Sequence, residues 1–195
     1  MFSGMQGRSY REGCPVPRED LVCVHALHVD AGGVTHTGEM ICNRCIADRV
    51  LGILEELYEN NYPIERMEPV DSYGGDDERS MEANNSSCFN FRMVSNTNVI
   101  SKHGMGLAVD INPLYNPCVR KVNGVLSVEP ETGKPYADRT GDFEYKIVKD
   151  DLCYRLFREN GFVWGGEWKS LKDYQHFEVP DEVSDELMKE YLQAK

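Results

Sequence analysis

Residues 101–110 read Ser-Lys-His-Gly-Met-Gly-Leu-Ala-Val-Asp, and they decide whether this part of the chain is helical or extended. On a helix, His103 and Asp110 would lie two turns, or about 10 Å, apart and could not reach one ion together. Gly104 and Gly106 instead allow the chain to bend. The following residues alternate as in a strand, so that Asp110 shares a face with residues too small to obstruct it. The sequence therefore predicts a turn that carries His103 and a strand that carries Asp110.

A second stretch, residues 164–178, reads Trp-Gly-Gly-Glu-Trp-Lys-Ser-Leu-Lys-Asp-Tyr-Gln-His-Phe-Glu. It ends in a predicted strand on which His176 and Glu178 face one way and Phe177 the other, with Asp173 shortly before the histidine. Two histidines and one carboxylate leave the fourth position of a tetrahedral zinc site open for water, which is the catalytic form of such a site. Alone, each of these residues would be read as a loop histidine or a capping acid. Together, the two stretches favour a metal site.

The N-terminal part of the chain predicts a hairpin and a helix. Residues 1–20 mix Gly, Pro, Arg and Glu without periodicity and indicate an irregular arm. Residues 21–42 indicate a β-hairpin that turns at a Gly-Gly pair, at an edge of the main sheet. Asn43 is the expected N-cap of a helix that extends to about Tyr58, because apolar residues recur there at three- and four-residue spacing. The polar segment 61–87 is expected to be mostly loop.

Beyond that segment, the pattern predicts two strands, a long excursion and two helices. The strands are expected at residues 87–94 and 106–111, and a proline-bearing excursion follows over residues 113–142. A helix is expected at about residues 146–160, ended by the glycine that follows it. A short helix from about Ser184 would close the chain.

Composition restricts the class of protein. The chain has 195 residues, 41% of them hydrophobic and 28% charged, which suits one globular domain over residues 21–195. The net charge of -12, without a basic stripe among aromatic residues, argues against a nucleic-acid partner. No apolar run approaches the roughly 20 residues that span a bilayer, and the opening residues lack the apolar stretch of a secretory signal. The seven cysteines favour mostly free, buried thiols.

The two stretches resemble a known family. The pattern Ser-x-His-x-x-Gly-x-Ala-x-Asp, followed far downstream by Trp-Gly-Gly-x-Trp and Asp-x-x-His-Phe-Glu, is similar to that of zinc D-alanyl-D-alanine carboxypeptidases, vancomycin-resistance dipeptidases and L-alanyl-D-glutamate endopeptidases. The resemblance extends from about Leu21 to Val179. It implies an α+β fold with a small antiparallel sheet flanked by helices, similar to that of Hedgehog signalling domains. It also implies a zinc cofactor and hydrolysis of amide bonds in peptidoglycan stem peptides.

The resemblance also assigns roles to individual residues. Three residues match the zinc ligands of the family: His103, Asp110 and His176. Asp173 matches the general base, and Arg92 matches the arginine that steadies the substrate carbonyl or carboxylate. Ser101 matches the serine that flanks the first ligand, and both Arg92 and Ser101 are expected to bind substrate. Gln175 departs from the proline or methionine of many relatives, a change that should affect local geometry more than chemistry.

Several side chains have alternative readings. A rival metal site could form on the predicted hairpin and the helix start, from Cys23, His25, His28, His36, Cys42 and Cys45. Because His25 and His28 would point to opposite faces of a strand, buried thiols and surface histidines are favoured there instead. Glu167 and Glu178 are alternative bases, although either could orient a ligand histidine.

Two further questions concern the substrate and the class of function. Trp164 and Trp168 could line a substrate groove or simply pack in the core. Removal of a terminal D-alanine is slightly favoured over internal cleavage between L-alanine and D-glutamate. The alternative from another class is a zinc-bearing binding module of the same fold that does not hydrolyse its ligand.

Overall fold

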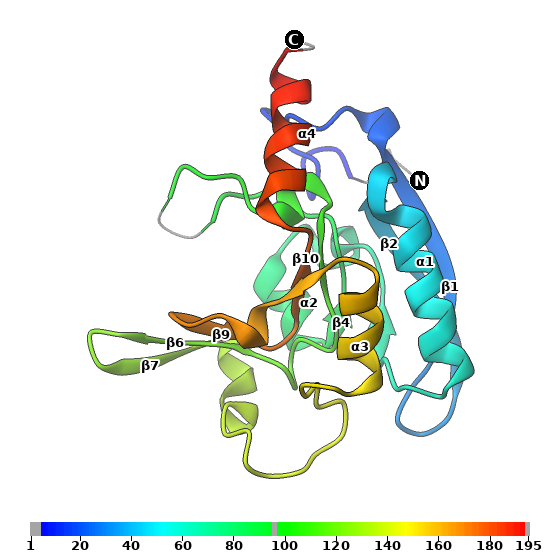
Figure 1. Ribbon diagram of the computed structural model, residues 1–195, viewed down its shortest axis with the longest axis vertical. Coiled ribbons are helices and arrows are strands. Elements are labelled where there is room, and N and C mark those ends of the chain that lie inside the picture. Colours follow the sequence, from blue (N-terminus) through cyan, green and yellow to red (C-terminus); the bar gives the residue numbers. More distant parts are fainter. Residues whose placement is uncertain (1–4, 95–96, 194–195) are drawn as a thin grey trace.

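The computed structural model describes residues 5–94 and 97–193 and has a mixed α and β architecture built from small sheets and few helices (Figure 1). The strands are β1 (Leu21–Val29), β2 (Thr35–Asn43), β3 (Arg66–Met67), β4 (Asn85–Ser86), β5 (Ala108–Asp110), β6 (Cys118–Val122), β7 (Val125–Glu129), β8 (Val163–Trp164), β9 (Leu171–Asp173) and β10 (His176–Glu178). The α-helices are α1 (Arg44–Glu59), α2 (Asp77–Glu82), α3 (Leu152–Glu159) and α4 (Asp181–Gln193).

Within the described ranges, the strands form four sheets. Three are antiparallel and have the orders β1-β2, β5-β10-β8 and β7-β6-β9, whereas β3 and β4 pair in parallel. The α+β class expected from the sequence is therefore correct. Among the described residues, no helix is both long and apolar enough to cross a bilayer.

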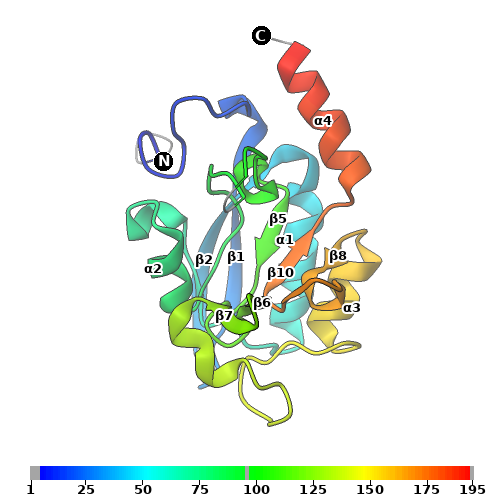
Figure 2. The same cartoon turned by 90° about the vertical axis from the view of Figure 1, so that its left-hand side faces the viewer.

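The predicted hairpin and first helix are confirmed, but the hairpin is not an edge of a larger sheet. β1 and β2 pair with each other from Leu21 opposite Asn43 onward, and Asn43 caps α1 by accepting a hydrogen bond from the Cys45 N–H. The hairpin meets the rest of the chain through isolated bonds, such as the one from the Asn43 N–H to the Gly106 carbonyl (2.9 Å). It remains a two-stranded sheet beside α1 (Figure 2).

The strand predicted at residues 87–94 is wrong. The amides of three successive residues, 89 to 91, donate to carbonyls on three different segments, those of Ile41, His103 and Ser9. A strand in a ladder would direct its bonds to one neighbour. The segment is irregular for that reason, and it joins the hairpin, the N-terminal arm and the turn that carries His103.

Two segments expected to be irregular contain regular structure. The polar segment includes α2, whose N-cap Asp76 accepts from the Arg79 N–H. The excursion includes the hairpin β6–β7, which turns at Asn123 and Gly124 with φ angles of 51° and 81°. Positive φ at both turn residues suits Asn-Gly in a two-residue hairpin turn. This hairpin pairs with β9 through β6 and projects from the body of the molecule (Figure 1).

The two C-terminal helices are present with shifted starts. α3 begins at Leu152, about six residues later than expected, because Asp151 is its N-cap and accepts from the Tyr154 N–H at 2.7 Å. Gly161 follows the helix with φ 84°, as expected for a glycine after a helix end. α4 begins at Asp181, three residues before Ser184.

The core anchors the sheet β5-β10-β8. Val109 on β5 and Phe177 on β10 are fully buried, and the Phe177 ring stacks on Phe157 of α3 with a centroid separation of 4.2 Å. The alternate residues of these strands then face away from the core. Met5 and Val16 of the N-terminal arm are buried as well, so the described part of the arm packs against the body.

Candidate metal centre and the cleft around it

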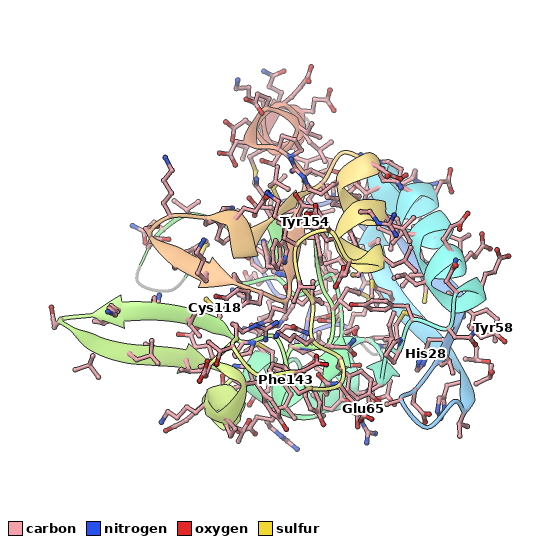
Figure 3. All side chains as sticks on the ribbon, turned by 60° about the horizontal axis from the view of Figure 1, so that its bottom comes forward. His28, Tyr58, Glu65, Cys118, Phe143 and Tyr154 are labelled. Atoms are coloured by element: carbon pink, nitrogen blue, oxygen red, sulfur yellow. The ribbon has the colours of Figure 1, made fainter. Side chains whose placement is uncertain are left out.

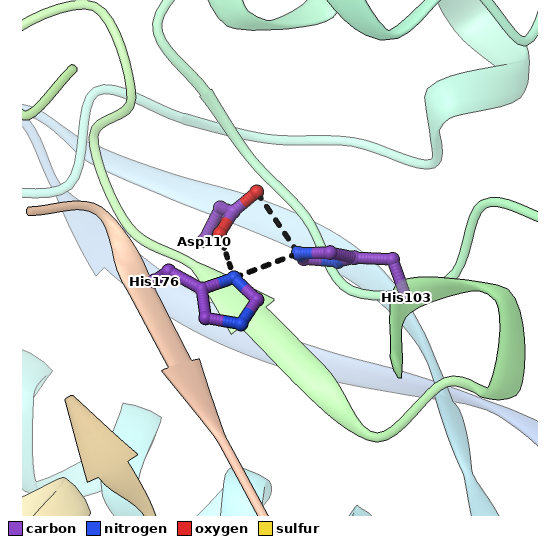
Figure 4. Close-up of side chains that lie close together, drawn as sticks. All are labelled: His103, Asp110 and His176. Atoms are coloured by element: carbon purple, nitrogen blue, oxygen red, sulfur yellow. Dashed lines mark hydrogen bonds and ion pairs between the residues drawn. The ribbon is translucent and has the colours of Figure 1, made fainter. Parts of the chain in front are cut away.

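His103, Asp110 and His176, here called the metal cluster, converge on one point (Figure 4). His103 Nε2 lies 3.2 Å from Asp110 Oδ2, His176 Nδ1 lies 3.1 Å from Asp110 Oδ1, and the two nitrogens are 3.1 Å apart. Ligand atoms at zinc distances in a tetrahedron would be separated by about 3.3 Å. The side chains thus fit a small divalent ion, and the structure brings together all three residues predicted as ligands.

The local backbone explains this convergence. Asp110 on β5 and His176 on β10 are direct cross-strand partners, so their side chains share one face of the sheet. His103 lies in the 3-10 turn Lys102–Met105, where the Ser101 Oγ accepts from the His103 N–H. Gly106 ends this turn with φ 68°, and a Cβ there would lie 2.7 Å from the Asn43 nitrogen. Only glycine fits this position, as the bend predicted from the sequence requires.

Each imidazole directs one nitrogen into the metal cluster because its other nitrogen is occupied. The His103 Nδ1–H donates to the Cys88 carbonyl at 2.7 Å, which leaves Nε2 as the free acceptor. The His176 Nε2–H donates to Glu178 Oε2 at 2.9 Å, and Lys102 holds the other oxygen of Glu178 at 3.0 Å. Such outer bonds fix the tautomer and orientation of metal ligands. Glu178 therefore orients a ligand histidine, which is one of the two roles proposed for it from the sequence.

The electrostatics of the metal cluster also suit a cation. Burial acts to raise the pKa of Asp110, but the two histidines beside it hold that pKa well below its usual range. Burial opposes protonation of His176, yet its hydrogen bonds to Asp110 and Glu178 raise its pKa to about 10. Carboxylates thus favour positive charge at this point, which a divalent ion would supply.

Asp173 lies beside the metal cluster in a cleft of about 600 Å³ that all four side chains line. Its Oδ1 is buried and has no hydrogen-bond partner among the described residues. Burial raises the pKa of the Asp173 carboxyl to about 6. A Cβ on Gly165 would lie 2.6 Å from the Asp173 carbonyl, so the Gly-Gly turn permits this close approach.

Arg92 and Ser101 also line the cleft. Arg92 Nη2 pairs with Asp77 Oδ2 at 2.9 Å, and Arg92 Nε is buried without a partner in the part of the chain that the structure describes. The Ser101 N–H donates to the Arg92 carbonyl at 3.0 Å. Gly104 lets the turn that carries His103 pack against the segment that carries Arg92, because a Cβ there would lie 3.1 Å from the Arg92 carbonyl oxygen. The two residues therefore flank the metal cluster on the same side as the first ligand.

The remaining aromatic and acidic candidates separate into those inside and those outside the cleft. The Trp168 ring lies 5.3 Å from the His176 ring and lines the cleft, whereas Trp164 is buried and donates its indole N–H to the Tyr174 carbonyl. Glu167 lies outside the residues that line the cleft and accepts from the Tyr154 hydroxyl at 3.0 Å. It is therefore poorly placed to act as a base at the metal cluster.

The rival metal site does not form. Within the described residues, the metal cluster is the one group of at least three possible ligands that converges. His28, His36 and Asp30, here called the hairpin group, resemble the metal cluster in composition. Contrary to expectation, His28 is buried, where its Nδ1–H donates to the Ile64 carbonyl at 2.7 Å. Cys45, expected to be a buried thiol, is exposed.

The sequence-based reasoning missed four contributors to the site. The Cys88 carbonyl, which orients His103, has no recognisable sequence signal. Asp77, which holds Arg92, was left inside a polar segment, and Lys102, which holds Glu178, was given no role. Arg120 lines the cleft from β6, and the Asn-Gly pair at the turn of its hairpin is a signal that could have located that strand.

Comparison with known families agrees with this arrangement. Residues 95–179 match a family model described as D-alanyl-D-alanine carboxypeptidase, and that range contains the metal cluster, Ser101 and Asp173 but not Arg92. No solved structure matches the chain. The segment that carries the metal cluster is therefore similar to the peptidase family that the sequence motifs resemble.

Proposed function

We propose that this protein is a zinc-dependent peptidase that hydrolyses amide bonds in peptidoglycan stem peptides, and that it acts as a D-alanyl-D-alanine carboxypeptidase. The observation that carries the proposal is the metal cluster at the wall of an open cleft, with the buried carboxylate of Asp173 beside it. A structural zinc site is closed by four protein ligands, whereas three ligands leave a position for the reaction. The match to the carboxypeptidase model supports the choice of substrate.

His103 Nε2, Asp110 and His176 Nδ1 would hold the zinc ion. When bound, zinc would supply a Lewis acid for the scissile carbonyl and would activate water near neutral pH. The outer contacts of the two histidines keep the required nitrogens free for that purpose. We also propose that the arrangement of helices and sheets is the one shared by D-alanyl-D-alanine peptidases and Hedgehog signalling domains.

The other cleft residues would manage protons and substrate. The Asp173 carboxylate would accept a proton from the attacking water and return it to the leaving amine, and a pKa of about 6 suits a base that works near neutrality. Arg92, held by Asp77 through one edge, would direct its remaining donors at a substrate carbonyl or carboxylate. The Ser101 hydroxyl accepts from the His103 N–H, so its own hydrogen could be donated to substrate.

A pair of test peptides separates terminal from internal cleavage. The zinc-loaded protein is incubated with a stem pentapeptide that has a free C-terminus and with the same peptide amidated at that end, and the products are identified by mass spectrometry. A carboxypeptidase that grips the terminal carboxylate through Arg92 should release D-alanine from the first peptide and leave the second intact. Undiminished cleavage of the amidated peptide would contradict the carboxypeptidase assignment and favour the endopeptidase.

A further inference from the structure

One wall of the cleft is a face of the sheet β7-β6-β9. Cys118 on β6 lies directly opposite Asp173 on β9 and Glu129 on β7, and Arg120 lies opposite Leu171. Cross-strand partners, and residues two apart on a strand, share a face of a sheet. All five of these side chains line the cleft. Figure 3 labels Cys118 where β6 runs beside β9. The proposed base and Arg120 therefore belong to one continuous surface.

Arg120 lies farther along this wall than the proposed base. It is two residues beyond Cys118, the cross-strand partner of Asp173, which corresponds to about 7 Å along the strand. An extended peptide advances by about the same distance in two residues. A substrate whose scissile amide lies at Asp173, and whose chain follows the wall, would thus pass Arg120 one or two residues from the cleavage point.

The Arg120 guanidinium retains donors for a ligand. Its Nη2 pairs with Glu129 Oε1 at 2.7 Å, whereas its Nε is buried without a partner in the described part of the structure. About a third of the side chain is exposed. Arg92 has the same arrangement, with one edge on Asp77 and an unpaired Nε. A guanidinium has five donors in a planar fork that matches a carboxylate, and one pairing leaves most of them available.

We propose that Arg120 is a specificity residue that binds an internal carboxylate of the substrate, one or two residues from the scissile amide. The inference rests on the proposed peptidase function and adds a substrate class to it. That class is acidic peptides with a free carboxylate within the chain, for example the α-carboxylate of a glutamate that is linked through its γ-carboxyl group. The site of this recognition is distinct from Arg92, which lies on the side of the cleft formed by Asp77 and Ser101.

The test compares two stem pentapeptides that differ in one group. One has a γ-linked glutamate with a free α-carboxylate, and in the other that carboxylate is an amide. We expect Arg120→Gln to raise KM for the first peptide by about ten- to a hundredfold, the usual contribution of a hydrogen bond to a charged group. The kcat value and the KM for the amide peptide should change little, so the preference for the carboxylate disappears.

Two further variants serve as controls. Lys121→Gln removes a charge from the next residue of β6, which is exposed and faces away from the cleft, and it should keep the parent preference. The double variant Arg120→Gln with Glu129→Gln removes the carboxylate that the single variant leaves unpaired. It should still lack the preference. Recovery of the preference in the double variant, or its persistence in Arg120→Gln, would overturn the proposal.

Failure of the peptidase proposal would be recognised separately. If the zinc-loaded parent cleaves neither peptide, the same two peptides are titrated into the parent and into Arg120→Gln by calorimetry. Tighter binding of the carboxylate peptide by the parent, lost in the variant, would support the role of Arg120 without turnover. Equal affinities for both peptides in the parent would overturn it.

Discussion

The metal cluster and the hairpin group contain the same side chains, two histidines and an aspartate, but they are arranged differently. In the metal cluster the two rings meet edge to face at 63°, with a centroid separation of 5.0 Å, and a nitrogen of one lies 3.1 Å from a nitrogen of the other. In the hairpin group the rings stack at 25° with a centroid separation of 5.2 Å. Stacked rings direct their nitrogens sideways, so the hairpin group offers no common point for an ion.

The difference follows from the direction in which each histidine enters. His28 and His36 are direct partners on two antiparallel strands, so their side chains leave the sheet side by side. His103 comes from a 3-10 turn and His176 from a strand, and one ring nitrogen of each lies 3.1 Å from that of the other. The outer partners do not separate the two groups. His28 and His103 each bond outward to a carbonyl, and each group contains a contact between a histidine and its aspartate. Composition and proximity are therefore insufficient to make a metal site.

The largest expected effect comes from removing the metal. Dialysis of the parent against a chelator should reduce hydrolysis of a stem peptide to the uncatalysed background, and about one equivalent of zinc should restore it. A His36→Ala variant should lose and regain activity in the same way, because the hairpin group has no part in the reaction. Activity that persists in fully metal-free parent protein would contradict the claim that the metal cluster, unlike the hairpin group, holds a catalytic metal.

Asp173→Asn should have the next largest effect. It keeps the size and shape of the side chain and removes the proton acceptor, so turnover should fall by about 10²–10⁴, or roughly 3–5 kcal/mol of barrier. Zinc content and melting temperature are measured beside the rate and should be close to those of the parent. Unchanged turnover would exclude Asp173 as the base and promote Glu178, the other candidate carboxylate that lines the cleft. A parent that turns over no stem peptide at all would favour the binding module.

Glu178→Gln tests the outer contacts of the metal cluster. The variant keeps an acceptor for His176 but loses the charge that Lys102 compensates, and zinc affinity should weaken by about 10- to 100-fold. Competition with a zinc-sensitive dye gives the affinity. Glu167→Gln is the matched control, since that carboxylate lies outside the residues that line the cleft, and it should retain the parent affinity. Equal losses in both variants would point to a general effect of charge.

His28→Ala should affect stability and leave zinc binding intact. The variant leaves the Ile64 carbonyl without its partner and should lower the free energy of unfolding by about 1–3 kcal/mol. Burial lowers the pKa of His28, so below about pH 6.5 the unfolded chain binds a proton there more readily than the folded chain. The parent should thus lose more stability than the variant on acidification. Denaturant titrations at two pH values measure this, and identical pH dependence would refute it.

The smallest effect is expected at the exposed end of the hairpin group. His36→Ala removes a contact with Asp30 in which about two fifths of the histidine side chain is exposed. Exposed ion pairs contribute little to stability, because solvent screens them. The unfolding midpoint in denaturant should therefore shift only slightly, and a loss larger than that of His28→Ala would reverse the ranking.

The sequence predicted those parts of the fold that depend on local chemistry. The Asn43 cap, the apolar spacing of α1 and the glycine after α3 each specify a structure from a few neighbouring residues. The strand expected at residues 87–94 failed because its amides are satisfied by three separate segments, which no local pattern records. The start of α3 was predicted about six residues too early, because Asp151 is the N-cap and that role was not predicted for it.

The candidate site was predicted where a motif fixes it and was missed where it depends on packing. The ligand set and Asp173 follow from spacing and resemblance, and the structure gathers them in one cleft. Which of the two tryptophans lines the cleft depends on packing: Trp168 meets the His176 ring, whereas Trp164 bonds to the Tyr174 carbonyl. Arg120 reaches the cleft only because β6 pairs with β9, a contact between segments about fifty residues apart in the sequence.

The zinc content of two single variants tests the central claim most directly. The parent, His36→Ala and His176→Ala are purified with equal zinc exposure, and bound metal is measured by atomic emission alongside circular dichroism to confirm folding. We expect about one zinc per chain in the parent and in His36→Ala, and almost none in folded His176→Ala. Full zinc occupancy in His176→Ala, or loss of zinc in His36→Ala, would contradict the assignment of the metal cluster.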